Sequence, residues 1–207
     1  RMGQFEKAYE SLPKTLNIGI KNSPNEIEVR YYQRKSAWII ISQRNEQLKQ
    51  EGIESLNTLS NLLFSHNEDN NPLWLWHYYN IKANLEEWNK NLEEAIENYK
   101  KCLSIPTLGA FEYGATFVNM AITYRCKYIE QEIKKVATIN KSIKLGRLGL
   151  LLKQSVGEKD EMPVVLHNLA LNILYKISNT LIDVSLCNEV LDLTQEALEI
   201  LEKTKSI

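Results

Sequence analysis

The chain has 207 residues, 43% of them hydrophobic, so it can bury a sizeable core and lacks the composition of a disordered protein. Its 25 basic residues nearly balance its 26 acidic ones, which gives no reason to expect a nucleic acid or a membrane surface as partner. No apolar run approaches the roughly 20 residues that a membrane-spanning helix needs. Strict alternation of apolar and polar residues is almost absent, and we therefore expect an all-α fold.

The chain opens on what looks like the second helix of a helical hairpin, in residues 3–9, and Pro13 shortens or kinks it. The first helix of that hairpin would precede Arg1. We therefore expect the chain to be a fragment of a longer protein. The alternative is a natural terminus with a single capping helix.

Apolar residues at the helical period predict the elements that follow. A turn at residues 22–25 leads into a helix over residues 26–44, and its partner covers residues 49–65. Pro72 after Asn71 opens the next helix, which runs to Trp88. Its partner covers residues 92–103 and ends before Pro106, and one face of it is apolar while its glutamates and lysines take the other.

Two further hairpins are predicted after Pro106. Helices over residues 108–132 and 136–154 form the first, and a charged loop over residues 156–161 follows it. Helices over residues 163–176 and 188–203 form the second, and residues 180–185 could extend either helix. Small residues recur in the second helices at intervals of 44, 43 and 42 residues, at Ala8, Gly52, Ala95 and Ala137.

These hairpins resemble tetratricopeptide repeats. The motif Phe117-x2-Met120-Ala121-x2-Tyr124 is similar to the first helix of that repeat, and Ala95-x3-Tyr99 followed by Pro106 is similar to its second half. Residues 166–173 match the first-helix motif less well, and the period is nearer 43 than 34 residues. The resemblance implies an all-α, right-handed superhelical solenoid of antiparallel helical hairpins, forming a single domain over residues 1–207.

The resemblance is to the long-helix branch of the family, whose members bind peptides or proteins in a concave groove lined by first helices and do not usually catalyse. It implies a non-catalytic protein- or peptide-binding scaffold or sensor, and self-association into a homo-oligomer would also fit. The alternative is the ligand-sensing domain of a multidomain regulator whose DNA-binding or enzymatic domain lies outside this segment.

The resemblance also implies a set of site residues. In peptide-binding relatives an asparagine two positions before the small residue of the first helix hydrogen-bonds the ligand backbone. Asn119 and Asn168 match that position, and Asn80 matches it in a motif where Lys82 replaces the small residue. The same register places Arg125 and His167 on this surface, where they could bind an acidic group. The other interpretation is that these asparagines cap or brace neighbouring helices.

No cluster of residues points to catalysis, a metal or a cofactor. The three histidines have no metal-ligating partner at helical spacing, and Gly146-Arg147-Leu148-Gly149 lacks the lysine of a phosphate loop, so we interpret it as a helix-packing segment. Three isolated cysteines without a C-x-x-C pair indicate a reducing compartment, and we expect a cytoplasmic protein.

Two features leave alternatives open. Residues 133–157 hold six bases and no acid, whereas residues 181–202 hold six acids and no base. These segments could pair with each other, or the basic one could bind an anionic partner. Aromatic residues over 74–88 either pack in the core or line a groove for an apolar peptide: Trp74, Trp76, Tyr78, Tyr79 and Trp88.

Overall fold

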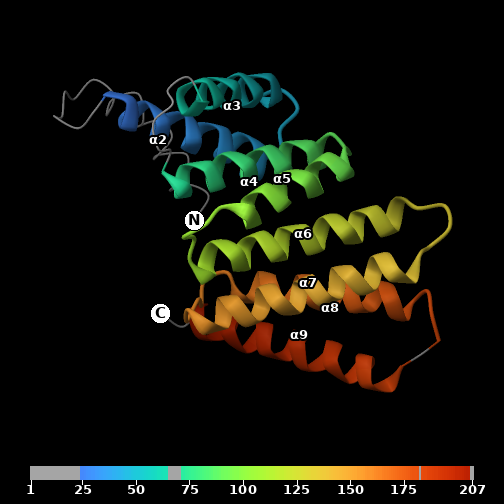
Figure 1. Ribbon diagram of the computed structural model, residues 1–207. Helices are drawn as coiled ribbons and strands as arrows, with labels where there is room; N and C mark the ends of the chain where they lie inside the picture. The colour runs from blue at the N-terminus through green and yellow to red at the C-terminus, as the bar shows by residue number, and fades with distance from the viewer. Residues whose placement is uncertain (1–23, 65–70, 182, 206–207) are drawn as a thin grey trace. The chain divides into compact units, whose positions relative to one another are not determined.

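The computed structural model describes residues 24–64, 71–181 and 183–205, and all the regular structure in these ranges is helical (Figure 1). The elements are α2 (Pro24–Ala37), a π-helix (Trp38–Gln43), α3 (Lys49–Phe64), α4 (Pro72–Trp88), α5 (Leu92–Ser104), α6 (Ala110–Glu130), α7 (Val136–Ser155), α8 (Met162–Ile177) and α9 (Val184–Lys205). The predicted all-α class is confirmed. The helix predicted in the first 20 residues lies outside the described ranges.

The chain divides into two compact units, Arg1–Ile105 and Pro106–Ile207, and each is described by itself. In the first unit α2 packs against α3, and α4 packs against α5. The predicted aromatic stripe of α4 belongs to the core, since Tyr78 is buried with Ile81 and Leu85 while Trp74 and Trp88 pack against them. Aliphatic residues from the earlier helices complete this core: Val29, Ile40, Leu56, Leu59 and Leu63.

The helix predicted over residues 26–44 changes geometry part-way. After Ala37 the chain widens into π-helical turns, and consecutive Ile39 and Ile40 are both fully buried there. A Cβ on Gly52 of α3 would lie 2.8 Å from Ile39 Cγ2, so a glycine is what lets α3 come this close. Arg44 ends the π-helix in the left-handed region, with φ of 45°.

The hairpin of α4 and α5 follows the prediction closely. The N–H of Leu73 donates to Asn71 Oδ1 at 2.9 Å and Pro72 takes the first turn, so α4 begins where its cap predicts. In α5 the predicted apolar face is buried, with Ala95, Tyr99 and Cys102 fully enclosed. The glutamates and lysines of the opposite face are exposed.

In the second unit the most extensive helix contact is between α6 and α7. A Cβ on Gly149 of α7 would lie 2.6 Å from Val118 Cγ2 and 3.0 Å from the Val118 backbone nitrogen, while Gly114 supplies the facing small residue on α6. The glycines of residues 146–149 therefore serve helix packing, as predicted. Ala137 does not, because it lies exposed in the first turn of α7. The regular spacing of small residues fails there.

The remaining hairpin pairs α8 with α9 over an apolar core that includes Leu166, Leu169 and Ile173. Helix α9 begins at Val184, so the last part of the segment 180–185, which could have extended either helix, belongs to α9. Asp183 Oδ1 accepts from the N–H groups of Ser185 and Leu186 and so caps this helix. No helix in the described part of the chain is both long and apolar enough to span a membrane.

Candidate functional site

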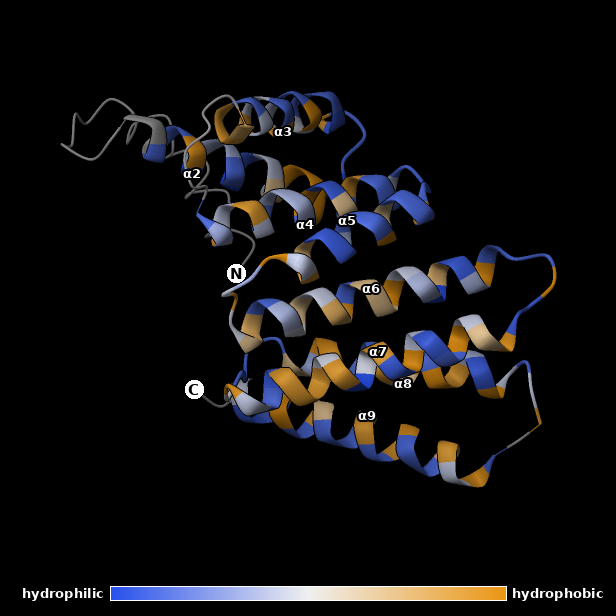
Figure 2. Cartoon of the chain, viewed as in Figure 1, coloured by the Kyte–Doolittle hydropathy of each residue, from blue (hydrophilic) through white to orange (hydrophobic). Residues whose placement is uncertain are grey.

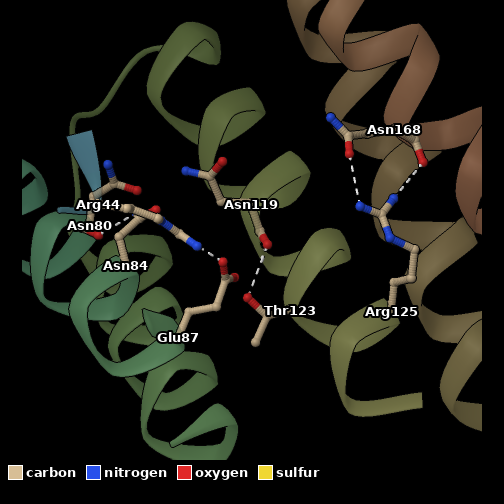
Figure 3. Close-up of polar contacts among 8 residues, drawn as sticks. All are labelled: Arg44, Asn80, Asn84, Glu87, Asn119, Thr123, Arg125 and Asn168. Carbon is tan, nitrogen blue, oxygen red and sulfur yellow. Dashed lines mark hydrogen bonds and ion pairs between the residues drawn. The ribbon is translucent and has the colours of Figure 1, made fainter. Parts of the chain in front are cut away.

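In the first unit, the predicted site residue Asn80 lies on α4 and is only 8% exposed. Its backbone carbonyl accepts a hydrogen bond from Asn84 Nδ2 at 2.9 Å, one turn further on (Figure 3). On the same helix, Glu87 Oε1 pairs with Nη2 of Arg44, the residue that ends the π-helix, at 2.9 Å. The burial of Asn80 leaves a ligand little access to its side chain in this geometry.

In the second unit, Asn119 lies half-buried on α6, and its backbone carbonyl accepts from Thr123 Oγ1 at 3.1 Å (Figure 3). Asn119 and Arg125 are six residues apart, a spacing that turns them to different sides of a helix with about 3.6 residues per turn. The structure therefore does not gather these two predicted residues at one point.

Arg125 and Asn168 are brought together. Arg125 Nη2 donates to Asn168 Oδ1 at 3.0 Å, and Arg125 Nη1 donates to the Asn168 carbonyl at 3.1 Å (Figure 3). Arg125 Nη1 also donates to Asn172 Oδ1 at 2.8 Å. Asn168 Nδ2 in turn donates to the Val164 carbonyl. These bonds tie α6 to α8, so the geometry favours the bracing role for this pair over direct capture of an acidic ligand group.

Each first helix carries a pair of polar residues, of which the sequence analysis predicted only the first as a site residue. Asn80 and Asn84, Asn119 and Thr123, and Asn168 and Asn172 each stand four residues apart on their helices. In the first two pairs the second side chain donates to the carbonyl of the first. The signal was available in the sequence as a second polar residue one turn after each matched asparagine.

His167 points to a different surface from Arg125, the groove where α8 meets the C-terminal half of α9. This groove has a volume of about 470 Å³ and is lined almost entirely by apolar atoms, with Pro163, Val164, His167, Thr194, Ala197, Leu198 and Leu201 around it. We call it the α8–α9 groove. Val164 is 59% exposed and Leu198 is 60% exposed, so it is open to solvent.

The aromatic residues of α4 lie in the contacts of this helix with its neighbours. Trp76 is buried, and its backbone carbonyl lies 3.6 Å from the Sγ of Cys102, which donates to it. Burial is the main cause that raises the pKa of Tyr79, and the neighbouring Tyr78 raises it further. Lys101 Nζ stands 5.4 Å from the centre of the Tyr79 ring. These rings serve the packing of α4 against its neighbours.

The oppositely charged segments meet at Arg147 and Glu189. Arg147 of α7 donates from Nε and Nη2 to the carboxylate of Glu189 on α9, at 3.1 and 2.6 Å. Lys153 is 1% exposed, pairs with Glu161 at 2.6 Å and stands 3.6 Å from the centre of the Phe111 ring. Part of the basic segment is therefore used inside the fold.

Within the described ranges, no group of three or more His, Cys, Asp or Glu side chains is placed to hold a metal ion. Cys102 is enclosed, and burial raises the pKa of its thiol to about 12, which keeps it in the protonated, weakly nucleophilic form. The described cysteines are all free.

The helices are arranged as in a tetratricopeptide-repeat-like fold. A solved structure described as MamA superposes on 100% of this chain and 94% of its own, with a TM-score of 0.53 and 16% sequence identity. This similarity shows the fold alone. No model of a known protein family matches the chain. No curated protein matches it either.

Proposed function

We propose that this chain is a non-catalytic module that binds a protein or peptide, and that the α8–α9 groove is its main contact site. The observation that carries the proposal is the row of exposed apolar side chains in that groove, at Val164, Leu198 and Leu201. Apolar side chains grouped in an open hollow commonly mark an interaction site, whereas scattered ones do not. Figure 2 shows the hydrophobic stretches of α9 interleaved with hydrophilic ones along the helix.

The groove suits an apolar anchor residue of a ligand. Its walls offer side-chain contact without charged groups, and the His167 imidazole at the edge can donate or accept a hydrogen bond. Asn119, on the other side of the unit, stays a proposed secondary contact. Arg125 and Asn168 act here as a brace that fixes α8 relative to α6, which keeps the groove preformed.

The fold supports a scaffold rather than an enzyme. Stacked helical hairpins present extended surfaces, and proteins built this way use those surfaces for binding. We also propose that residues 1–207 form a single repeat domain, that the protein is cytoplasmic and that it self-associates. No feature of the described residues favours the sensor of a multidomain regulator over a plain scaffold.

The test is to select peptides from a random display library on the wild-type chain and then to measure their affinity for Leu198→Glu. We expect affinity to fall about tenfold or more, because an unpaired carboxylate would face apolar ligand atoms. Leu191→Glu is the matched control, since Leu191 is a leucine of similar exposure on α9 outside the groove. Equal affinity for all three chains would reject this groove as the site.

A further inference from the structure

A second groove lies at the opposite end of the α8–α9 hairpin, on the side of α7. It has a volume of about 520 Å³ and is open to solvent. Its walls are apolar and its edge is basic, with Ile143, Leu148, Leu151 and Leu186 in the walls and Lys144, Arg147 and Lys176 at the edge. We call it the α7 groove. It shares no lining residue with the α8–α9 groove.

Three bases of residues 133–157 that lie outside the α7 groove are already engaged within the fold. Lys141 Nζ stands 4.6 Å from the centre of the Tyr124 ring, Lys134 donates to carbonyls at the end of α6, and Lys153 is paired and buried. By contrast, among the residues that the structure describes, no carboxylate pairs with Lys144 or Lys176. Two unpaired cations therefore flank an apolar hollow.

One wall shows which chemistry fits this surface. Helix α9 places Leu186 in the apolar wall and, one turn later, Glu189 on Arg147 at 2.6 Å. A leucine and a glutamate spaced by three residues on one helix thus satisfy both the apolar and the basic part of the groove. Lys144, Lys176 and Leu151 remain available to a second element of the same kind, and Leu151 is 63% exposed.

We propose that the α7 groove binds an acidic amphipathic helix of a partner protein. The lining residues of α7 run from Asn140 to Leu151 along one face, which is about 16 Å or three turns of helix. Rows of side chains four apart on such a face accept the ridges of another helix. Carboxylates on the partner face Lys144 and Lys176, and its leucines cover Leu148 and Leu151.

The same features count against a nucleic acid. A protein that follows a phosphate backbone needs several cations in a row, whereas most bases of residues 133–157 are held by rings, carbonyls or carboxylates of this chain. Exposed leucines between the remaining cations offer nothing to phosphate. They match the apolar side of an amphipathic helix.

The probe is a labelled peptide with the sequence of residues 184–202, carrying Cys187→Ser. This peptide holds five acidic residues. It also holds three apolar residues seven positions apart, which are exposed on α9: Val184, Leu191 and Leu198. Fluorescence anisotropy is measured with the full chain, with the Lys144→Glu, Lys176→Glu double variant and with Leu151→Glu. Lys135→Glu, an exposed lysine of the same basic segment outside the groove, is the control.

We expect the double variant and Leu151→Glu each to weaken binding about tenfold or more, Lys135→Glu to leave it unchanged, and added salt to weaken it. A peptide with its acids changed to glutamine should bind poorly. Equal binding to all the folded variants, or binding of the glutamine peptide as tight as that of the acidic one, would overturn the proposal.

Two further results would assign a different ligand to the α7 groove and so overturn the proposal. Self-association of the wild-type chain in sedimentation, lost in the Lys144→Glu, Lys176→Glu variant, would make a second copy the occupant. Displacement of the peptide by a single-stranded oligonucleotide at low salt would make it a nucleic acid. Neither result would bear on the α8–α9 groove, which is tested through Leu198→Glu.

Discussion

At Gly149 the absence of a side chain sets the distance between α7 and α6. An added methyl group would lie 2.6 Å from Val118 Cγ2 and 3.1 Å from the Gly114 carbonyl oxygen, so the backbones must separate. We expect Gly149→Ala to lower the free energy of unfolding by about 1–3 kcal/mol in urea denaturation. Gly146→Ala is the control. Its methyl group would meet the flexible end of Leu169 at 3.1 Å, so it should cost less, and the reverse order would contradict this packing.

Cys102 gives a prediction with a definite pH range. Because burial raises the pKa of this thiol from 9.0 to about 12, the folded chain holds the proton more tightly than the unfolded chain. Its contribution to stability is complete below pH 9 and is lost as pH rises towards 12. We expect Cys102→Ala to flatten the decline in stability over that range. In the folded wild type, Cys102 should react with iodoacetamide far more slowly than Cys187, and similar rates would refute its burial.

Single residues could be predicted where a local pattern determines them. Ala95 and Ala121, the small residues of the two repeat motifs, are almost fully buried. Ala137 was grouped with the small residues of the second helices by its spacing alone and is exposed, because the contact of α7 falls in its second half, at Gly149. The bond from Arg125 to Asn168 joins residues 43 apart and depends on how α8 is rotated against α6, which no local pattern states.

At the scale of elements, the brace between α6 and α8 carries its own prediction. Arg125→Gln removes the guanidinium donors that hold Asn168 and Asn172, and the amide oxygen of the buried Asn172 loses its partner. We expect the free energy of unfolding to fall by about 1–3 kcal/mol. The control is Arg30→Gln, since Arg30 forms an exposed pair within α2 that contributes little. Equal effects in thermal denaturation would mean that the brace does not stabilise the unit.

Element boundaries were predictable where a cap or a proline marks them and less so elsewhere. The start of α4 follows from Asn71 and Pro72, and its end at Trp88 from the apolar stripe. The start of α9 was left open between residues 180 and 188 because Asp183 was not recognised as its cap. The π-helix at Trp38–Gln43 was missed, since three consecutive isoleucines fit an α-helix equally well by pattern.

At the scale of the molecule, each compact unit has its own core. The buried residues of the apolar cluster in the second unit lie between Val118 and Ala197. We therefore expect residues 106–207, expressed alone, to keep a strongly helical circular dichroism spectrum and to unfold cooperatively. Helical hairpin arrays tolerate such division because their contacts are between neighbours. A disordered spectrum for this segment would show that its fold depends on the first unit.

The helical class and the order of hairpins could be predicted from sequence because the 3.6-residue period persists through them. The binding grooves could not. The α8–α9 groove needs Val164 and Leu198 side by side, and the α7 groove needs Lys144 beside Lys176. Each pair is more than 30 residues apart in the sequence, so each contact depends on tertiary packing.

The most direct test of the account is hydrogen–deuterium exchange of the chain with and without a peptide selected on it. Protein binding at the α8–α9 groove predicts slower exchange in residues 162–168 of α8 and residues 194–201 of α9, with α4 and α5 unchanged. Protection confined to the first unit, or to the face of α6 that carries Asn119, would contradict the central claim.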